Sequence, residues 1–436
     1  MFSIHEWNAV TDSERDSLLQ RPAHDAAVLI EQQAADIIEQ VRRDGDAGVR
    51  AVTARIDGTE LTRLQVAATD LAAALTDCDG GLRSALTVAR DNVAAFHAAQ
   101  PGNAVQVETV PGVVCERREV PIETVGLYVP AGSAPLVSSV IMQAVPAQLA
   151  GCPRRILCTP PQTNGDADPT ILAAAALCGI DEVFAIGGAQ AIAAMAYGTE
   201  TVPRVDKIFG PGNAWVAAAK KLVTQGGATA TDLVAGPSEV LVVADGGADP
   251  VFVAADLLAQ AEHGADSQVL LVSTDTALVD AVVREAQRQL QQLARSGIVR
   301  ECLENSVAIV VDKLDDAFDI VNRYAPEHLI LQITDARRWL DRVRNAGSVF
   351  LGRWTPEALG DYCSGTNHVL PTGGNARNSS GLGVADFQKT ITVQEATAAG
   401  LERLGPTATT LARVERLDGH AQSVDLRLAR LRAGAA

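Results

Sequence analysis

The sequence predicts an α/β protein with two parallel sheets. Short apolar runs recur along the chain without the strict alternation of half-exposed strands, and helix-like segments separate them. Strands that are apolar on both faces, with helices between them, are typical of a parallel sheet covered by helices. The same rhythm restarts after Gly236, and the 436 residues are enough for two domains.

The first α/β block begins near residue 120. Its predicted strands are TVGLYV (124–129), RRILCTP (154–160), EVFAIGG (182–188) and DKIFG (206–210), and its predicted helices are 138–151, 168–179, 189–198 and 214–226. An earlier helix is predicted from about residue 25. Its apolar stripe comprises Val28, Ile30, Ala34, Ile37, Ile38 and Val41, and Gly45 is expected to end it.

The second block follows Gly236. Its predicted strands are EVLVVAD (239–245), QVLLVST (268–274), VAIVVDK (307–313), LILQIT (329–334) and SVFLG (348–352), with helices near 250–262, 276–296, 314–324 and 335–345. Beyond about residue 385 no further strand-plus-helix unit is expected. Val424, Leu428 and Leu431 are spaced i, i+4, i+7, which predicts an amphipathic helix that must dock on another surface.

Charge and cysteine usage exclude several classes of protein. The net charge is −17, so no nucleic acid is expected as a partner, since phosphate binding needs a basic surface. Seven cysteines without any CxxC motif argue against a disulfide framework and favour a reducing cytoplasm. The first residues lack the apolar stretch of a signal peptide, and no run approaches a membrane span. We therefore expect a cytoplasmic protein with no membrane partner.

Glycine-rich loops match the dinucleotide fingerprint only in part. GPGNAW (210–215) has the first two glycines of GxGxxG, but Trp215 takes the third position, and Asp232 is a weak match for the acidic residue that binds ribose. GLGVAD (381–386) fails in the same way. Gly187 and Gly188 precede a predicted helix, where a ligand can approach the backbone. A nucleotide would have to bind through a non-standard loop.

A candidate metal site involves the end of the helix near 250–262. Gln260 and His263 share a face of its last turn, where the helix dipole favours a cation. Asp361 follows a predicted strand, at the carboxyl edge where α/β sheets form sites, and His420 lies in a turn-like DGH. Two imidazoles, a carboxylate and an amide oxygen suit Zn²⁺. The alternative is that these are structural or solvated side chains.

An acid–base candidate is the adjacent pair Glu327 and His328 in YAPEHLIL. Pro326 stops the preceding helix, so both side chains emerge just before a strand. An imidazole and a carboxylate can divide base work between them. The alternative is a surface turn with two polar residues.

A catalytic cysteine is a weaker prediction. Most of the cysteines considered lie in or beside apolar segments, namely Cys115, Cys152, Cys158 and Cys178, which favours inert packing. Cys363 alone lies in a polar loop next to another candidate residue.

Eight segments in order resemble the histidinol dehydrogenase family along nearly the whole chain. They are VGLYVPAGSAPL (125–136), AIGGAQAIAAMAYGT (185–199), KIFGPGNAWV (207–216), DLVAGPSEVLVVAD (232–245), DLLAQAEHG (256–264), YAPEHL (324–329), FLGRWTPEALGDYCSGTNHVLPT (350–372) and ERLDGHAQSV (415–424). The combination is highly specific. The resemblance implies NAD-dependent oxidation of L-histidinol, through L-histidinal, to L-histidine, the last step of histidine biosynthesis.

The resemblance also implies the residues of the site. The ligands of one Zn²⁺ per subunit fall on Gln260, His263, Asp361 and His420, and the catalytic pair on Glu327 and His328. Substrate contacts fall on these six residues together with Ser238 and Glu415, and NAD contacts on Tyr128, Gln190 and Asn213. A homodimer is implied in which Glu415 and His420 reach the partner's site.

The implied fold is a pair of incomplete Rossmann-like domains, one inserted in the other, with small terminal extensions. Residues 1–25 are expected to form an N-terminal arm, and 26–127 with 239–380 the domain bearing the metal and catalytic residues. Residues 128–238 would form the NAD-contacting domain and 381–436 the C-terminal extension. Two other functions stay open: a zinc hydrolase that uses the same metal site without NAD, and a non-catalytic metabolite-binding relative.

Overall fold

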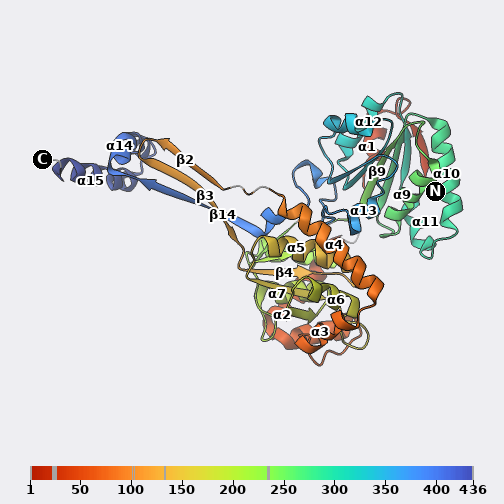
Figure 1. Cartoon of the computed structure of the whole chain (residues 1–436), viewed down its shortest axis with the longest axis horizontal. Coiled ribbons are helices and arrows are strands. Elements are labelled where there is room, and N and C mark those ends of the chain that lie inside the picture. Colours follow the sequence, from red (N-terminus) through yellow and green to blue (C-terminus); the bar gives the residue numbers. More distant parts are fainter. Residues whose placement is uncertain are drawn as a thin grey trace. The chain divides into compact units, whose positions relative to one another are not determined.

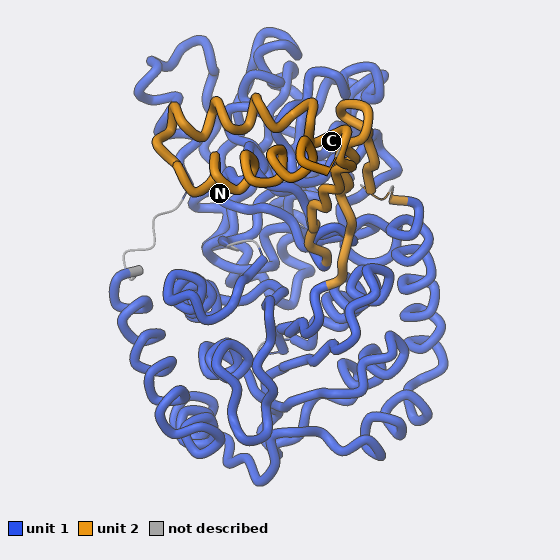
Figure 2. The backbone as a smooth tube through the Cα atoms, turned by 90° about the vertical axis from the view of Figure 1, so that its left-hand side faces the viewer, with its two compact units in different colours: residues 1–99, 122–387 blue, residues 100–121, 388–436 orange. Residues whose placement is uncertain are grey.

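The computed structural model describes residues 2–21, 27–100, 102, 104–131, 134–232 and 236–434. The chain divides into two compact units (Figure 2). Unit 1 comprises residues 1–99 and 122–387, and unit 2 comprises 100–121 and 388–436. Each is described by itself.

One domain of unit 1 is built on a six-stranded, all-parallel sheet (Figure 1). The strand order is β1-β11-β10-β9-β12-β13. The strands are β1 (Ser3–Glu6), β9 (Glu239–Ala244), β10 (Gln268–Ser273), β11 (Val307–Val310), β12 (His328–Gln332) and β13 (Ser348–Leu351). Every residue of β9, β10 and β12 is buried, which confirms the prediction from their uninterrupted apolar runs.

Helices cover both faces of this sheet. One face packs against α9 (Pro250–Ala261), α10 (Thr276–Leu290) and α11 (Ser296–Glu304). The other packs against α12 (Leu314–Tyr324), the end of α1 (Asp12–Leu18) and the 3-10 helix η1 (Ala336–Arg342). Beyond β13 the chain forms α13 (Glu357–Tyr362) and two 3-10 helices, η2 (Asn375–Arg377) and η3 (Val384–Phe387).

The other domain of unit 1 is built on a five-stranded parallel sheet of order β6-β5-β4-β7-β8. Its strands are β4 (Thr124–Tyr128), β5 (Arg154–Thr159), β6 (Glu182–Ala185), β7 (Lys207–Phe209) and β8 (Ala230–Thr231). Its helices include α5 (Val137–Leu149), α6 (Pro169–Leu177), α7 (Gly188–Tyr197) and α8 (Ala214–Gln225). All five strands lie between β1 and β9 in the sequence, so one domain is inserted in the other, as predicted.

The segment from 27 to 98 packs on the five-stranded sheet, whereas the sequence analysis assigned it to the other domain. It forms α2 (Ala27–Ile56), α3 (Ala68–Asp77) and α4 (Gly80–Ala98). Two apolar clusters join it to that sheet: α2 to α7 and α8 on one face, α3 and α4 to α5 and α6 on the other. The apolar stripe of α2 was predicted correctly except at Val28, which is 84% exposed. Gly45 (φ 56°, ψ −135°) is not helical and divides α2 into two helical stretches at a kink, so the predicted end of the first stretch is confirmed.

The N-terminal residues are not a separate arm. Ser3–Glu6 form the edge strand β1, which pairs in parallel with β11, and Trp7 and Leu19 are buried in the core of the six-stranded domain. Residues 22–26, which complete the predicted arm, lie outside the described residues.

Unit 2 is an antiparallel sheet of order β14-β3-β2 with two helices. Its elements are β2 (Val105–Val110), β3 (Val113–Pro121), β14 (Gln388–Ala396), α14 (Ala398–Val414) and α15 (Asp418–Gly434). The predicted tail helix is α15, and Leu428 is buried where α15 packs on α14. The expectation of no further strand-plus-helix unit beyond about residue 385 was wrong, since β14 is followed by α14. Because β14 is largely exposed, it has no buried apolar run to reveal it.

No helix of the described residues is long and apolar enough to cross a membrane.

Candidate active site

The predicted catalytic residues lie at the amino edge of the six-stranded sheet. His328 is the first residue of β12, and Glu239 is the first residue of the neighbouring strand β9. Helix α9 runs back across the sheet, so its last turn, with Gln260, reaches the same edge. The metal site was predicted at the carboxyl ends of strands. That placement was wrong because these side chains come from strand starts and a helix end.

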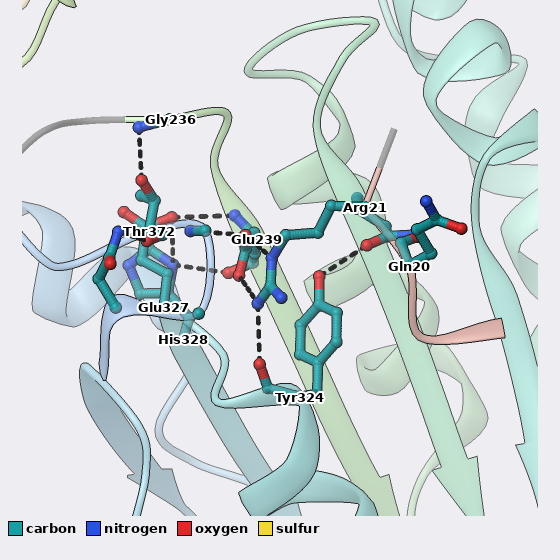
Figure 3. Close-up of polar contacts among 12 residues, drawn as sticks. Gln20, Arg21, Gly236, Glu239, Tyr324, Glu327, His328 and Thr372 are labelled. Atoms are coloured by element: carbon teal, nitrogen blue, oxygen red, sulfur yellow. Dashed lines mark hydrogen bonds and ion pairs between the residues drawn. The ribbon is translucent and has the colours of Figure 1, made fainter. Parts of the chain in front are cut away.

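Glu327 and His328 are both held by the backbone of Glu239 (Figure 3). The Glu239 N–H donates to Oε2 of Glu327 at 2.9 Å, and the Glu239 carbonyl oxygen lies 3.2 Å from Nδ1 of His328. Nδ1 also lies 3.1 Å from Oε1 of Gln260. A carbonyl oxygen only accepts, so Nδ1 bears a proton. Nε2 is left 3.6 Å from Oδ1 of Asp361 as the nitrogen available for proton transfer.

Burial decides against the surface-turn alternative. Glu327 is 5% exposed and His328 is 4% exposed. Burial raises the pKa of Glu327 to about 7. Although burial alone would lower it, the carboxylates of Glu357, Glu327 and Asp361 raise the pKa of His328 to about 10. The pair is therefore buried in surroundings rich in negative charge.

Three of the four predicted metal ligands are described in unit 1. Gln260 is fully buried in the last turn of α9, His263 is an exposed residue just beyond that helix, and Asp361 is on α13. The ligand atoms of His263, Asp361 and Glu357 lie within 4.8 Å of one another. Glu357, 2% exposed, was missed by the sequence analysis. Its i, i+4 spacing from Asp361 on one short helix was the available signal.

The side chains at this edge fit a cation. His328 Nε2 and Glu357 Oε2 are buried and have no hydrogen-bond partner within the described part of the chain. Buried polar atoms are normally paired, so unpaired ones that converge indicate a site for a ligand. Imidazole, carboxylate and amide oxygen are donors that Zn²⁺ accepts.

The remaining predicted residues of this site belong to unit 2 or are less buried. Ser238 immediately precedes β9 and is half-buried, and its carbonyl accepts from Gln268 at 3.2 Å. Glu415 follows α14 and His420 lies in the first turn of α15, so both belong to unit 2, and both are exposed.

His368 supports the segment of Asp361 and was not predicted as a site residue. Its Nδ1 donates to the backbone carbonyl of Asp361 at 2.7 Å, and its Nε2 lies 3.2 Å from Oγ of Ser139. Because Nδ1 faces a carbonyl, Nε2 accepts from the Ser139 hydroxyl. The hydrogen bond between His368 and Ser139 joins α5 to the loop beyond α13.

The predicted cofactor residues line a separate cavity of about 430 Å³ at the carboxyl edge of the five-stranded sheet. The lining residues include Tyr128, Gln190, Asn213, Gly188, Asp57 and Trp215. Tyr128 Oη accepts from the Gly188 N–H at 3.0 Å, Asn213 caps α8, and Gln190 donates to Asp57 at 3.1 Å. Tyr128 is the last residue of β4, and Gln190 and Asn213 follow β6 and β7, so all three lie at the edge where such sheets bind nucleotides.

Two details of the GPGNAW loop differ from a standard fingerprint. Gly210 has φ +117°, and a Cβ there would lie 2.1 Å from the Tyr128 carbonyl oxygen, so only glycine fits. Asp232, the weak match for a ribose ligand, is instead buried in an ion pair with Lys220 and accepts from the Gly210 N–H at 2.7 Å. Asp232 therefore holds the loop and is not open to a ligand.

The cysteines support the packing alternative. Burial raises the pKa of Cys152 to about 11 and that of Cys178 to about 12. Such thiols are poor nucleophiles at neutral pH. Cys363 is half-buried, and its backbone carbonyl accepts from Asn92 at 2.8 Å.

Together these features define an α/β enzyme with an imidazole–carboxylate site in one domain and a cavity at the carboxyl edge of the sheet in the inserted domain. The sequence pattern of the histidinol dehydrogenase family matches residues 19–428. Histidinol dehydrogenase of Xylella fastidiosa (strain 9a5c) is 55% identical over 425 residues, which cover 98% of this chain and 99% of the relative. That of Aliivibrio fischeri (strain ATCC 700601 / ES114) is 50% identical over 426 residues, 98% of this chain and 96% of the relative.

A solved structure agrees with the sequence comparison. The crystal structure of histidinol dehydrogenase from Elizabethkingia anophelis matches with a TM-score of 0.93 and 43% identity, covering 99% of this chain and 98% of that one. The chain belongs to the histidinol dehydrogenase family.

Proposed function

We propose that this protein oxidises L-histidinol through L-histidinal to L-histidine, with NAD as the acceptor of both hydrides and one Zn²⁺ per subunit. The observation that carries the proposal is the burial of the adjacent residues Glu327 and His328. The free Nε2 atom of His328 faces the carboxylate of Asp361. The identity of the substrate is inferred from membership of the histidinol dehydrogenase family. The net reaction converts the alcohol, water and two NAD⁺ into the carboxylate, two NADH and three protons.

The chain's own residues provide the proton chemistry. His328 Nε2 accepts the hydroxyl proton as hydride leaves the substrate carbon, and Nδ1 stays protonated on the Glu239 carbonyl. Glu327, fixed by the Glu239 N–H, accepts a proton from the water that adds to the aldehyde. NAD supplies the hydride chemistry.

The metal would be held by Gln260, His263, Asp361 and His420, and it would anchor the imidazole and amine of the substrate. Glu357, within reach of His263 and Asp361, is a further donor at this site. A cation among these carboxylates would offset the charge that raises the pKa of His328. The ring would then be neutral and able to accept a proton.

We place NAD in the cavity lined by Tyr128, Gln190 and Asn213. The N-termini of α7 and α8 open on this cavity through Gly188 and Asn213, and helix N-termini favour phosphate. Gln190 Oε1 is buried and unpaired within the described part of the chain, so it is available to a ligand.

We further propose a cytoplasmic homodimer in which Glu415 and His420 complete the partner's site, with Ser238 among the substrate contacts. Both tail residues are exposed in unit 2, as a role in another subunit requires. The absence of any disulfide between the described cysteines is consistent with a reducing compartment.

The test measures the number of NADH molecules formed for each histidinol molecule consumed. Purified protein, L-histidinol, NAD and Zn²⁺ should yield two NADH per histidinol consumed, and a chelator should abolish turnover. Formation of no NADH would reject the proposal. Metal-dependent turnover without NAD would instead favour the hydrolase, for which family membership gives no support.

A further inference from the structure

We infer that Glu239 and Arg21 form a positioning pair that holds Glu327 and His328 in their working orientation; the inference rests on the proposed function. Neither residue is among the residues that the family resemblance implies for the site. Figure 3 shows the arrangement: Arg21 reaches Glu239 from one side, and Glu327 and His328 lie on the other.

Both proposed catalytic groups depend on the two peptide units that flank the Cα atom of Glu239. Its N–H fixes Glu327 at 2.9 Å and its carbonyl oxygen fixes Nδ1 of His328 at 3.2 Å. A main-chain group points in a direction that the backbone sets. Any shift of Glu239 therefore rotates the carboxylate and the imidazole together.

The side chain of Glu239 is anchored at several points. It is 2% exposed, and its carboxylate accepts from Nη2 of Arg21 at 2.8 Å and from the Gly373 N–H at 2.9 Å. Nε of Arg21 donates to the other oxygen in a two-pronged ion pair. Such a pair fixes orientation as well as distance.

Arg21 also holds the segment that leads to Glu327. Nη2 of Arg21 donates to the Tyr324 carbonyl at 2.9 Å, and the guanidinium lies 4.1 Å from the centre of the Tyr324 ring. Tyr324 is the last residue of α12, three positions before Glu327. One guanidinium thus joins the start of β9 to the chain that bears the catalytic pair.

Arg21 itself is held in place by its neighbour. The Gln20 carbonyl accepts from Nε2 of Gln268 at 3.1 Å, and Oε1 of Gln268 accepts from the Tyr324 hydroxyl at 2.8 Å. The polar contacts form a closed ring around the amino edge of the sheet. An ion pair with one buried partner adds little net stability compared with well-packed apolar side chains, so we assign the Arg21–Glu239 pair the role of fixing orientation.

The test compares turnover per metal-loaded site in Glu239→Gln and Arg21→Gln. Displacing a catalytic group by a fraction of an ångström should lower kcat between about 10- and 100-fold. The KM for histidinol and the zinc content should change little, because the metal ligands anchor the substrate and neither residue is among them. The double variant should be no slower than either single variant, since the two residues act as a unit. Arg21→Lys, which keeps the charge, should recover part of kcat.

A matched control is Arg154→Gln. Arg154 makes a two-pronged ion pair with Glu182, at 2.8 and 2.7 Å, on the five-stranded sheet. It should keep wild-type kcat. The single-turnover rate of NADH formation, divided by bound zinc, separates positioning from folding, because a merely structural loss lowers the number of sites and not the rate at each.

Wild-type rates per site in both Glu239→Gln and Arg21→Gln would overturn the inference, as would losses that follow zinc content alone. If Glu239→Gln does not fold, the comparison of Arg21→Gln with Arg21→Lys decides. A wild-type protein that forms no NADH would reject the proposed function instead, so the two failures are distinguishable.

Discussion

The Glu239 carbonyl oxygen lies 3.2 Å from Nδ1 of His328. Because the carbonyl cannot donate, this contact fixes the proton on Nδ1 and reserves Nε2 for chemistry. A substituted side chain that donates to the Glu239 carbonyl but cannot accept a proton therefore separates the two roles of His328, holding its position and acting as a base.

His328→Asn should abolish most turnover while keeping the fold and the metal. The asparagine amide replaces the donor to Glu239 but provides no base, so kcat should fall by about 10²- to 10⁴-fold. Zinc content, measured by atomic emission, should stay at wild-type level. Loss of zinc in this variant would mean that His328 is a ligand and has been misassigned.

Zinc should stabilise the protein, and Glu357 should contribute. Zinc at about 100 times its Kd would add about 2.7 kcal/mol to the free energy of unfolding, seen as a rise in Tm. His263→Asn should remove this rise, and Glu357→Gln should reduce it if Glu357 is a ligand, since its carboxylate lies within 4.8 Å of the ligand atoms of His263 and Asp361. If zinc raises the Tm of Glu357→Gln as much as that of the wild type, Glu357 is not a zinc ligand and acts only by raising the pKa of His328.

The sequence was most informative where strands are buried on both faces. All nine strands predicted for the two blocks are present, including β9 and β12, which position the site. The edge strand β1, the two-residue strand β8 and the unit 2 strands were not predicted, because none of them contains an uninterrupted run of buried apolar residues. The helix predicted over 276–296 is divided, since α10 ends at Leu290 and α11 starts at Ser296.

The location of contacts between segments was the main limit. The stripe of α2 identifies a buried helix face but not the sheet that it covers, so residues 27–98 were assigned to the wrong domain. The pairing of Glu327 and His328 was recognised from adjacency, whereas the support from Glu239 is through the backbone. A backbone hydrogen bond leaves no signature in residue identity, and Arg21 is 218 positions from Glu239.

The shared dimer site can be tested by mixing subunits. His328→Ala and His420→Ala homodimers should each be inactive. If Glu415 and His420 act in the partner's site, a mixed dimer contains one intact site. Random exchange of equal amounts should then restore about one quarter of wild-type activity. No recovery after mass spectrometry has verified mixed dimers would place His420 in the site of its own subunit.

Asp256 should make stability depend on pH. It lies on α9 at 6% exposure and accepts from Nε2 of Gln332 at 2.8 Å. Burial raises the pKa of Asp256 to about 6, from an ordinary value of 3.8. A carboxyl group with a raised pKa binds protons more tightly when folded, so its ionised form costs stability above pH 6. The cost disappears as the pH falls through 6 towards 4.

Asp256→Asn should therefore raise Tm at pH 8 and have little effect near pH 4. The asparagine oxygen still accepts from Gln332, while the buried charge is removed. A shift of about two pH units corresponds to at most about 3 kcal/mol in the free energy of unfolding. Asp280→Asn, at an exposed position of α10, serves as the control. A destabilised Asp256→Asn protein at pH 8 would contradict the expectation and show that the ionised carboxylate is required for the fold.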